Sequence, residues 1–143
     1  IATLAELYGR SRDEGFVTEN KRRIMIGSYV LSSGFFDAYY QQAQKARTIL
    51  INEYNTLFAT YAALLGPVAP TPAFLLGENT DDPIKMYLAD IMTVPPSLAG
   101  LPAISVPAGL STSGLPIGIQ LIGPQRSDAL LLSLAGSIEG QKV

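Results

Sequence analysis

The chain has neither histidine nor cysteine, and this limits the chemistry that its side chains can perform. A serine–histidine triad, a cysteine nucleophile and a thiolate zinc site are excluded within it. Serine–lysine chemistry and paired carboxylates remain. No lysine lies in a glycine-rich turn of the kind that presents a serine nucleophile, and each is expected in helical or terminal surroundings. The lysines are Lys21, Lys45, Lys85 and Lys142.

Two short stretches imitate catalytic motifs. Residues 32–34, Ser-Ser-Gly, look like a nucleophile turn, but they join two amphipathic helices and are explained equally well as a hinge. Asp81 and Asp82 are adjacent, so their side chains diverge, and capping of a helix explains them better than acid–base catalysis. The glycine spacing over residues 100–118 fits no phosphate-binding loop. From the residues we therefore identify no catalytic group and no metal site.

Two charged residues stand where helix electrostatics disfavours them. Arg23 falls in the basic first turn of a helix predicted over residues 20–32, where the helix dipole favours acids. Asp90 stands in an otherwise apolar stretch near the C-terminus of a helix predicted over residues 83–92, where an acid is unfavourable. Two interpretations are open for both residues. A solvated or salt-bridged surface charge is favoured over a buried ligand contact.

Helical periodicity accounts for most of the first half of the chain. Residues before Asn20 are expected to form a short helical piece and a loop. Apolar residues three or four apart predict a helix over 20–32 and a longer one from Phe35 to about Tyr61, with a break at Ser33-Gly34. Asp82 followed by Pro83 is an N-cap with proline at the first helical position, which predicts the start of the helix over 83–92.

Two short β-branched runs in the second half predict strands. They begin at Ala103 and at Ile117, each follows a Gly-Leu-Pro tripeptide, and a Ser/Gly turn centred on Thr112 separates them. A further buried strand is expected over residues 62–65, and a last helix from Ser127. Strands that alternate with helices in this way predict an α/β layer architecture.

Composition indicates a chain with too little polar surface. Its 143 residues have the size of one domain, but 48% are hydrophobic and only 15% are charged, whereas soluble domains carry about 25% charge. A large interface, or a segment of a bigger domain, explains this shortage. The start at Ile1 and the uncapped end "SIEGQKV" agree with the second explanation. We therefore expect residues 1–143 to form a single partial domain.

Net charge and hydropathy exclude other classes of protein. A net charge of −2 lacks the basic footprint of an autonomous nucleic-acid binder. No apolar run is long enough to cross a membrane, and no signal-peptide pattern is present. The absence of cysteine fits a reducing compartment. We expect a soluble protein, with no membrane partner, in the cytoplasm or an organellar matrix.

Several motifs together resemble those of one enzyme family. The segments "KRRIMIGSYVLSSG", "FDAYY" and "LAGLPAISVP" occur in the order and spacing of the amidase-signature family. They are most similar to the C-terminal part of one branch of it, the glutaminase subunits of glutamyl-tRNA(Gln) amidotransferases. The resemblance runs from about Tyr8 to Pro124. It implies an α/β fold in which a mixed sheet is covered by helices on both faces.

The resemblance also implies what the chain lacks and what it binds. The family's catalytic group is a serine nucleophile, a second serine in a cis peptide and a lysine, and all three lie N-terminal to the matched segment. We therefore expect this chain alone to be inactive, as a substrate-recognition and scaffold segment. In the glutaminase branch, the arginine at the position of Arg23 binds the α-carboxylate of glutamine. The aspartate at the position of Asp90 binds its α-ammonium.

The implied reaction of the whole glutaminase is hydrolysis of glutamine through an acyl-serine intermediate. The ammonia would convert Glu-tRNA(Gln) to Gln-tRNA(Gln) within a complex with amidotransferase subunits B and C. No cofactor is expected in this chain, because ATP and Mg²⁺ are used by the partner subunit. Two alternatives stay open: a general amidase-family hydrolase of small or acyl amides, and a non-catalytic interaction module.

Overall fold

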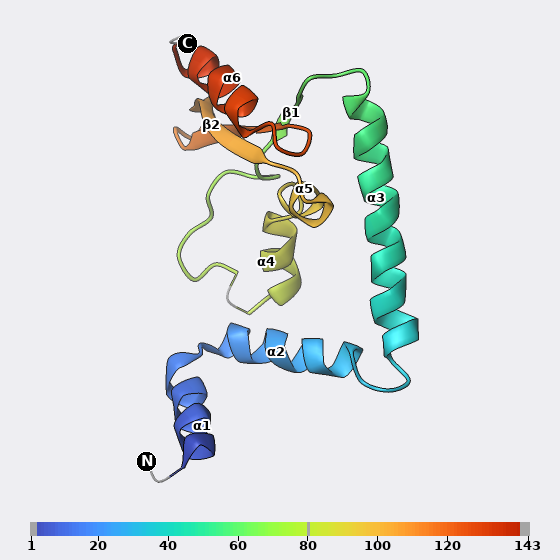
Figure 1. The fold of residues 1–143 in the computed structure, drawn as a ribbon. Coiled ribbons are helices and arrows are strands. Elements are labelled where there is room, and N and C mark those ends of the chain that lie inside the picture. The colour runs from blue at the N-terminus through green and yellow to red at the C-terminus, as the bar shows by residue number, and fades with distance from the viewer. Residues whose placement is uncertain (1–2, 80, 141–143) are drawn as a thin grey trace. The chain divides into compact units, whose positions relative to one another are not determined.

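The structure is a computed structural model that describes residues 3–79 and 81–140 (Figure 1). The chain divides into two compact units, Ile1–Ala46 and Arg47–Val143. The first unit is helical, and the second combines helices with a small sheet. The boundary falls within a single helix, α3 (Gln42–Phe58). The architecture is therefore mixed α/β, as the sequence predicts.

The first unit begins with α1 (Leu4–Gly15) and α2 (Thr18–Val30). The side chain of Thr3 caps α1 by accepting a hydrogen bond from the backbone N–H of Glu6, at 3.1 Å. The prediction of only a short helical piece is wrong, because α1 runs through Gly9. One glycine inside a helix costs only about 1 kcal/mol, and a capped helix of twelve residues tolerates it.

The helix α2 starts two residues earlier than predicted. Glu19 therefore stands in its first turn, and the basic residues come after it. The expectation that Arg23 lies in a basic first turn is wrong for this reason. An acid precedes the basic residues, in the place that the helix dipole favours.

A break and a π-helical turn follow α2. Residues 31–35 form turns, which confirms the predicted break. The next helix begins with η1 (Phe36–Gln41), a π-helical segment, and continues as α3. Aromatic rings pack along this region: the centroids of Tyr29 and Phe35 lie 4.2 Å apart, and those of Phe36 and Tyr40 lie 5.1 Å apart. The long helix predicted over 35–61 is confirmed from Phe36 to Phe58: it starts with a π-helical segment and ends three residues earlier than predicted.

The sheet of the second unit has the strand order β1-β3-β2, where β1 is Leu64–Pro67, β2 is Ala103–Leu110 and β3 is Pro116–Ile122. Both pairings are antiparallel. The expected mixed sheet is therefore wrong for the strands in the described residues. For β2 and β3 the reason is the short turn between them, since parallel neighbours need a crossover of about a dozen residues or more.

One face of the sheet packs against the last helix, α6 (Asp128–Gly140) (Figure 1). Val106 of β2 and Leu121 of β3 are buried against Leu131 and Ala135 of α6. Side chains alternate between faces along a strand, so Gln120 lies on the opposite face, paired in register with Ser105. The four buried apolar residues form the hydrophobic core between the sheet and α6.

The two Gly-Leu-Pro tripeptides enter their strands through the same backbone conformation. Gly100 ends α5 (Val94–Ala99) at φ 71°, and Gly114 closes the turn before β3 at φ 81°. Both angles lie in the left-handed region, where glycine carries no steric penalty. Each tripeptide therefore begins with a glycine in the left-handed conformation.

The segment before α5 carries Asp90. The helix α4 (Pro83–Ala89) starts at the predicted cap, because the carboxylate of Asp82 accepts hydrogen bonds from the backbone N–H groups of Ile84 and Lys85, each at 3.1 Å. It ends at Ala89, three residues earlier than predicted, and Asp90 is its C-cap. Within the described residues, no helix is both long and apolar enough to span a bilayer.

Candidate functional site

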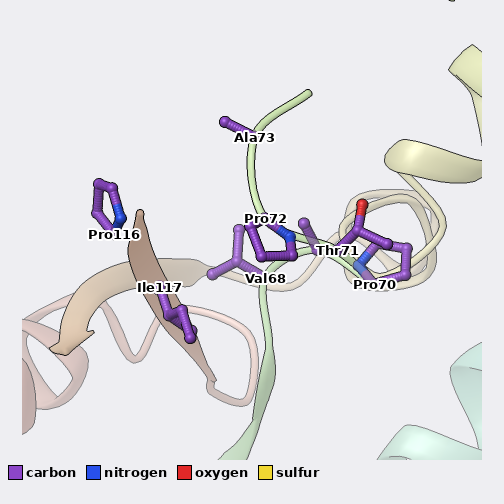
Figure 2. A pocket seen from close by; sticks show the side chains of 9 residues that line it. Val68, Pro70, Thr71, Pro72, Ala73, Pro116 and Ile117 are labelled. Carbon is purple, nitrogen blue, oxygen red and sulfur yellow. The ribbon is translucent and has the colours of Figure 1, made fainter. Parts of the chain in front are cut away.

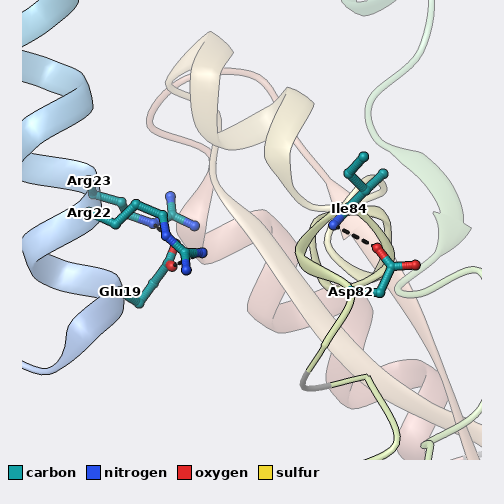
Figure 3. A network of polar contacts seen from close by, with 5 residues as sticks. All are labelled: Glu19, Arg22, Arg23, Asp82 and Ile84. Carbon is teal, nitrogen blue, oxygen red and sulfur yellow. Dashed lines mark hydrogen bonds and ion pairs between the residues drawn. The ribbon is translucent and has the colours of Figure 1, made fainter.

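Arg23 lies on the exposed surface of α2, next to an acidic partner. Its Nε donates a hydrogen bond to Oε1 of Glu19 at 2.9 Å, and Nη1 of Arg22 donates to Oε2 of the same carboxylate at 3.0 Å (Figure 3). The side chain of Arg23 is 65% exposed. Arg22 and Arg23 follow Glu19 by three and four residues, so the helix itself brings both arginines to the carboxylate.

A second ion pair involves Lys21, the basic residue that precedes Arg22 and Arg23. Lys21 Nζ donates to Oδ1 of Asp13 at 2.9 Å and to the backbone carbonyl of Asp13 at 2.8 Å. The hydrogen bond and the charge of Lys21 lower the pKa of the Asp13 carboxyl below its usual value. The basic residues of α2 are thus paired with two acids, Asp13 on α1 and Glu19 on α2.

Asp90 occupies the turn between α4 and α5, and its backbone closes that turn. Its carbonyl oxygen accepts hydrogen bonds from the N–H of Thr93 at 3.0 Å, from the N–H of Val94 at 3.1 Å and from the hydroxyl of Thr93 at 3.1 Å. Ser97 Oγ then donates to the carbonyl of Thr93 at 2.9 Å. The side chain of Asp90 is exposed.

The turn that carries Asp90 is tied to the sheet by a buried amide. Gln120 in β3 is only 5% exposed. Its Nε2 donates to the carbonyl of Met92 at 2.8 Å and to the carbonyl of Pro67 at 2.9 Å. Burial of an amide costs free energy unless hydrogen bonds compensate it, and these two bonds do so.

Two hollows border the sheet in the second unit. One, of about 250 Å³, is lined by four polar residues, Thr93, Ser97, Ser105 and Gln120, and by four apolar ones, Val68, Pro96, Ala103 and Ile104. The other, of about 290 Å³, lies where the proline-rich segment Val68–Ala73 passes the start of β3 (Figure 2). The side chains that line it are apolar except for that of Thr71, so it contains no ionisable side chain.

The two residues that the sequence predicts as ligand contacts lie in different units, Arg23 in the first and Asp90 in the second. Both residues are exposed: the Arg23 side chain is hydrogen-bonded to Glu19, whereas the hydrogen bonds at Asp90 are made by its backbone. Within residues 3–79 and 81–140, no group of three or more acidic, histidine or cysteine side chains could hold a metal ion.

A model of the amidase family matches residues 1–132, which is most of the chain. The chain belongs to the amidase family. It is 55% identical over 138 residues to the A subunit of the glutamyl-tRNA(Gln) amidotransferase of Brevibacillus brevis, in a match that covers 96% of this chain and 28% of that protein. The same subunit of Geobacter metallireducens is 53% identical over 138 residues, with the same coverage.

A solved structure extends the likeness to the amidase fold. The crystal structure of the A subunit of the Thermotoga maritima glutamyl-tRNA(Gln) amidotransferase superposes with a TM-score of 0.71 at 43% identity. The match covers 96% of this chain and 30% of that one. This amidase-family chain therefore spans a little over a quarter of the length of the curated relatives that it matches, about 28%.

Sequence reasoning missed two residues that support the predicted ligand contacts. Glu19 could have been found from its i, i+4 spacing to Arg23, which is a known signal for helical ion pairs. Gln120 is the one polar side chain in the otherwise apolar run of β3. Such a residue breaks the strand pattern, but its partners, which lie 28 and 53 residues earlier in the chain, carry no sequence signal.

Proposed function

We propose that the chain is the C-terminal substrate-recognition and scaffold segment of the glutaminase subunit of a glutamyl-tRNA(Gln) amidotransferase. The observation that carries this proposal is the 55% identity over 138 residues to the corresponding protein of Brevibacillus brevis, which extends through both units. The complete glutaminase hydrolyses glutamine through an acyl-serine intermediate. The ammonia then converts Glu-tRNA(Gln) to Gln-tRNA(Gln).

In this proposal the chemistry is divided between this chain and the rest of the glutaminase. The serine nucleophile, the second serine and the lysine belong to the remainder, so this chain alone is inactive. Subunits B and C complete the complex, and the partner subunit uses ATP and Mg²⁺. The complex works in the cytoplasm or in an organellar matrix. Residues 1–143 contribute one part of a larger amidase domain.

Arg23 and Asp90 select glutamine in this proposal. The planar guanidinium of Arg23 matches a carboxylate with two parallel hydrogen bonds, and the carboxylate of Asp90 takes the ammonium. An amide that lacks either group forgoes one of these charge-assisted contacts, and this favours glutamine. Both side chains are exposed in the described structure, so a ligand can reach each of them.

The experiment compares ammonia release from glutamine and from a neutral primary amide, butyramide, by the complete glutaminase in its complex. Loss of a charge-assisted hydrogen bond costs about 1.5–3 kcal/mol, so Arg23→Ala should lower kcat/KM for glutamine by about 10- to 100-fold. Its effect on butyramide should be much smaller. Asp90→Asn should act in the same direction.

Arg22→Ala is the matched control for Arg23→Ala. Arg22 is adjacent, has the same charge and pairs with the same Glu19 carboxylate, so its loss removes an equivalent helical ion pair. We expect this control to keep its preference for glutamine. Equal losses in the two variants, or no loss in Arg23→Ala, would refute the assignment. A native preference for butyramide would instead favour a general hydrolase of small amides.

A further inference from the structure

The only polar side chain on β3 is also one of the most buried polar groups of the described chain. Gln120 stands in the central strand of the sheet, with β1 on one side and β2 on the other. It is 5% exposed. A buried amide on a sheet face is costly unless its donors are used. Both bonds that Nε2 makes are short, at 2.8 and 2.9 Å.

The two acceptors of Gln120 belong to separate elements. One is the carbonyl of Pro67, at the end of β1. The other is the carbonyl of Met92, in the turn between α4 and α5. Gln120 therefore fastens that turn to the sheet at one defined point. An apolar side chain of the same length could fill the space but could not donate either bond.

Met92 lies inside the turn that Asp90 closes. The carbonyl of Asp90 accepts bonds from the backbone of Thr93 and Val94 and from the hydroxyl of Thr93, so residues 90–94 form one hydrogen-bonded unit. A bond that holds Met92 in place therefore also fixes the backbone from which the Asp90 carboxylate projects. Small misplacements of a binding group are costly for substrate positioning.

We propose that Gln120 is a positioning residue for Asp90: its buried amide holds the α4–α5 turn on the sheet, so that the Asp90 carboxylate meets the substrate ammonium. This inference rests on the proposed function, because it needs Asp90 to be a ligand contact. Gln120 itself lines a hollow next to that turn and acts on the substrate through Asp90.

The test uses the complete glutaminase in its complex and the variant Gln120→Met, which keeps the length of the side chain and removes both donors. We expect KM for glutamine to rise by about tenfold, with a much smaller change in kcat, since a binding contact is weakened rather than the chemistry. The ratio of kcat/KM for glutamine to that for butyramide should fall. Hydrogen exchange at the amides of Thr93 and Val94 should become faster.

A double variant separates positioning from general destabilisation. If Gln120 acts through Asp90, Gln120→Met should add no loss of glutamine preference in an Asp90→Asn background. Leu131→Ala, in the core on the other face of the sheet, serves as the control for lowered stability. Gln120→Asn keeps the amide but shortens its reach, and it should give an intermediate effect if the methionine variant does not fold.

Three results would overturn the inference. They are an equal loss on both substrates, an equal loss with and without Asp90, and unchanged exchange at Thr93 and Val94. The failure of the proposed function is distinct, because it would appear in Asp90→Asn alone: that single variant would leave the preference for glutamine unchanged.

Discussion

Replacing Asp82 by alanine should loosen α4 without disturbing the sheet. The carboxylate of Asp82 accepts hydrogen bonds from the N–H groups of Ile84 and Lys85, both at 3.1 Å, and its backbone carbonyl accepts one from the N–H of Met86 at 3.2 Å. The alanine variant loses the first two bonds and keeps the third. Two donors at the helix start then have only water as a partner.

The expected magnitude follows from the capping energy. Loss of an N-cap acceptor costs about 1 kcal/mol, which corresponds to a change of about fivefold in an opening equilibrium. Because α4 has only seven residues, the whole helix should share the effect. Hydrogen exchange of the complete glutaminase, followed by mass spectrometry on peptides that cover residues 82–90, should show about fivefold faster exchange there.

Two neighbouring variants make this prediction specific. Asp81→Ala removes the same charge one residue earlier and leaves the cap in place, so exchange in α4 should stay close to that of the native protein. Asp82→Asn keeps a side-chain acceptor and should also stay close to native, since asparagine caps about as well as aspartate. Equal acceleration in Asp81→Ala and Asp82→Ala, or none in Asp82→Ala, would refute the capping argument.

Further predictions concern charge and backbone conformation. The pKa of Asp13 is lowered by Lys21, so this ion pair stabilises the fold above the unfolded pKa of the carboxyl and is lost as the pH falls through the lower folded pKa. In Lys21→Gln, an NMR titration should show the Asp13 pKa rising towards its usual value, and an unchanged pKa would contradict the pairing. Gly114→Ala should destabilise the chain by about 1–2 kcal/mol in thermal unfolding, because φ is 81° there. Gly136→Ala, in the interior of α6 with no atom within 4 Å of an added Cβ, should instead stabilise it by about 0.5–1 kcal/mol. Shifts of the same sign in the two glycine variants would refute the conformational argument.

Local signals in the sequence predicted several elements correctly. Asp82 supplies a capping acceptor, and Pro83 has a backbone φ that suits the first position of a helix; α4 starts there. The β-branched runs at β2 and β3 are short and bounded by glycine turns, and this pattern indicates strands. The break before η1 also follows from local chemistry, a glycine between two amphipathic runs.

Elements that depend on competing local preferences were predicted less well. Residues 93–100 indicate a loop or a single helical turn by sequence, and the structure has a helix of six residues there, α5, whose first turn accepts proline. The π-helical start at η1 has no sequence signal. The mixed sheet was expected from the resemblance alone, whereas the short turn between β2 and β3 requires an antiparallel pair.

In the candidate site, too, some features could be predicted from local sequence and others could not. Arg23 and Asp90 were singled out by charge in an unexpected position, but the acid that precedes Arg23 in α2 removes the electrostatic anomaly that drew attention to it. The role of Gln120 depends on contacts with Met92 and Pro67, which are distant in sequence. Contacts between residues so far apart in the sequence become visible only in the folded structure.

The most direct test of the central claim is ammonia release from glutamine and from butyramide, measured for this chain and for the same chain extended N-terminally through its native reading frame. We expect this chain to release no ammonia from either amide and the extended chain to be active with a preference for glutamine. Activity of this chain alone, or a preference of the extended chain for butyramide, would contradict it.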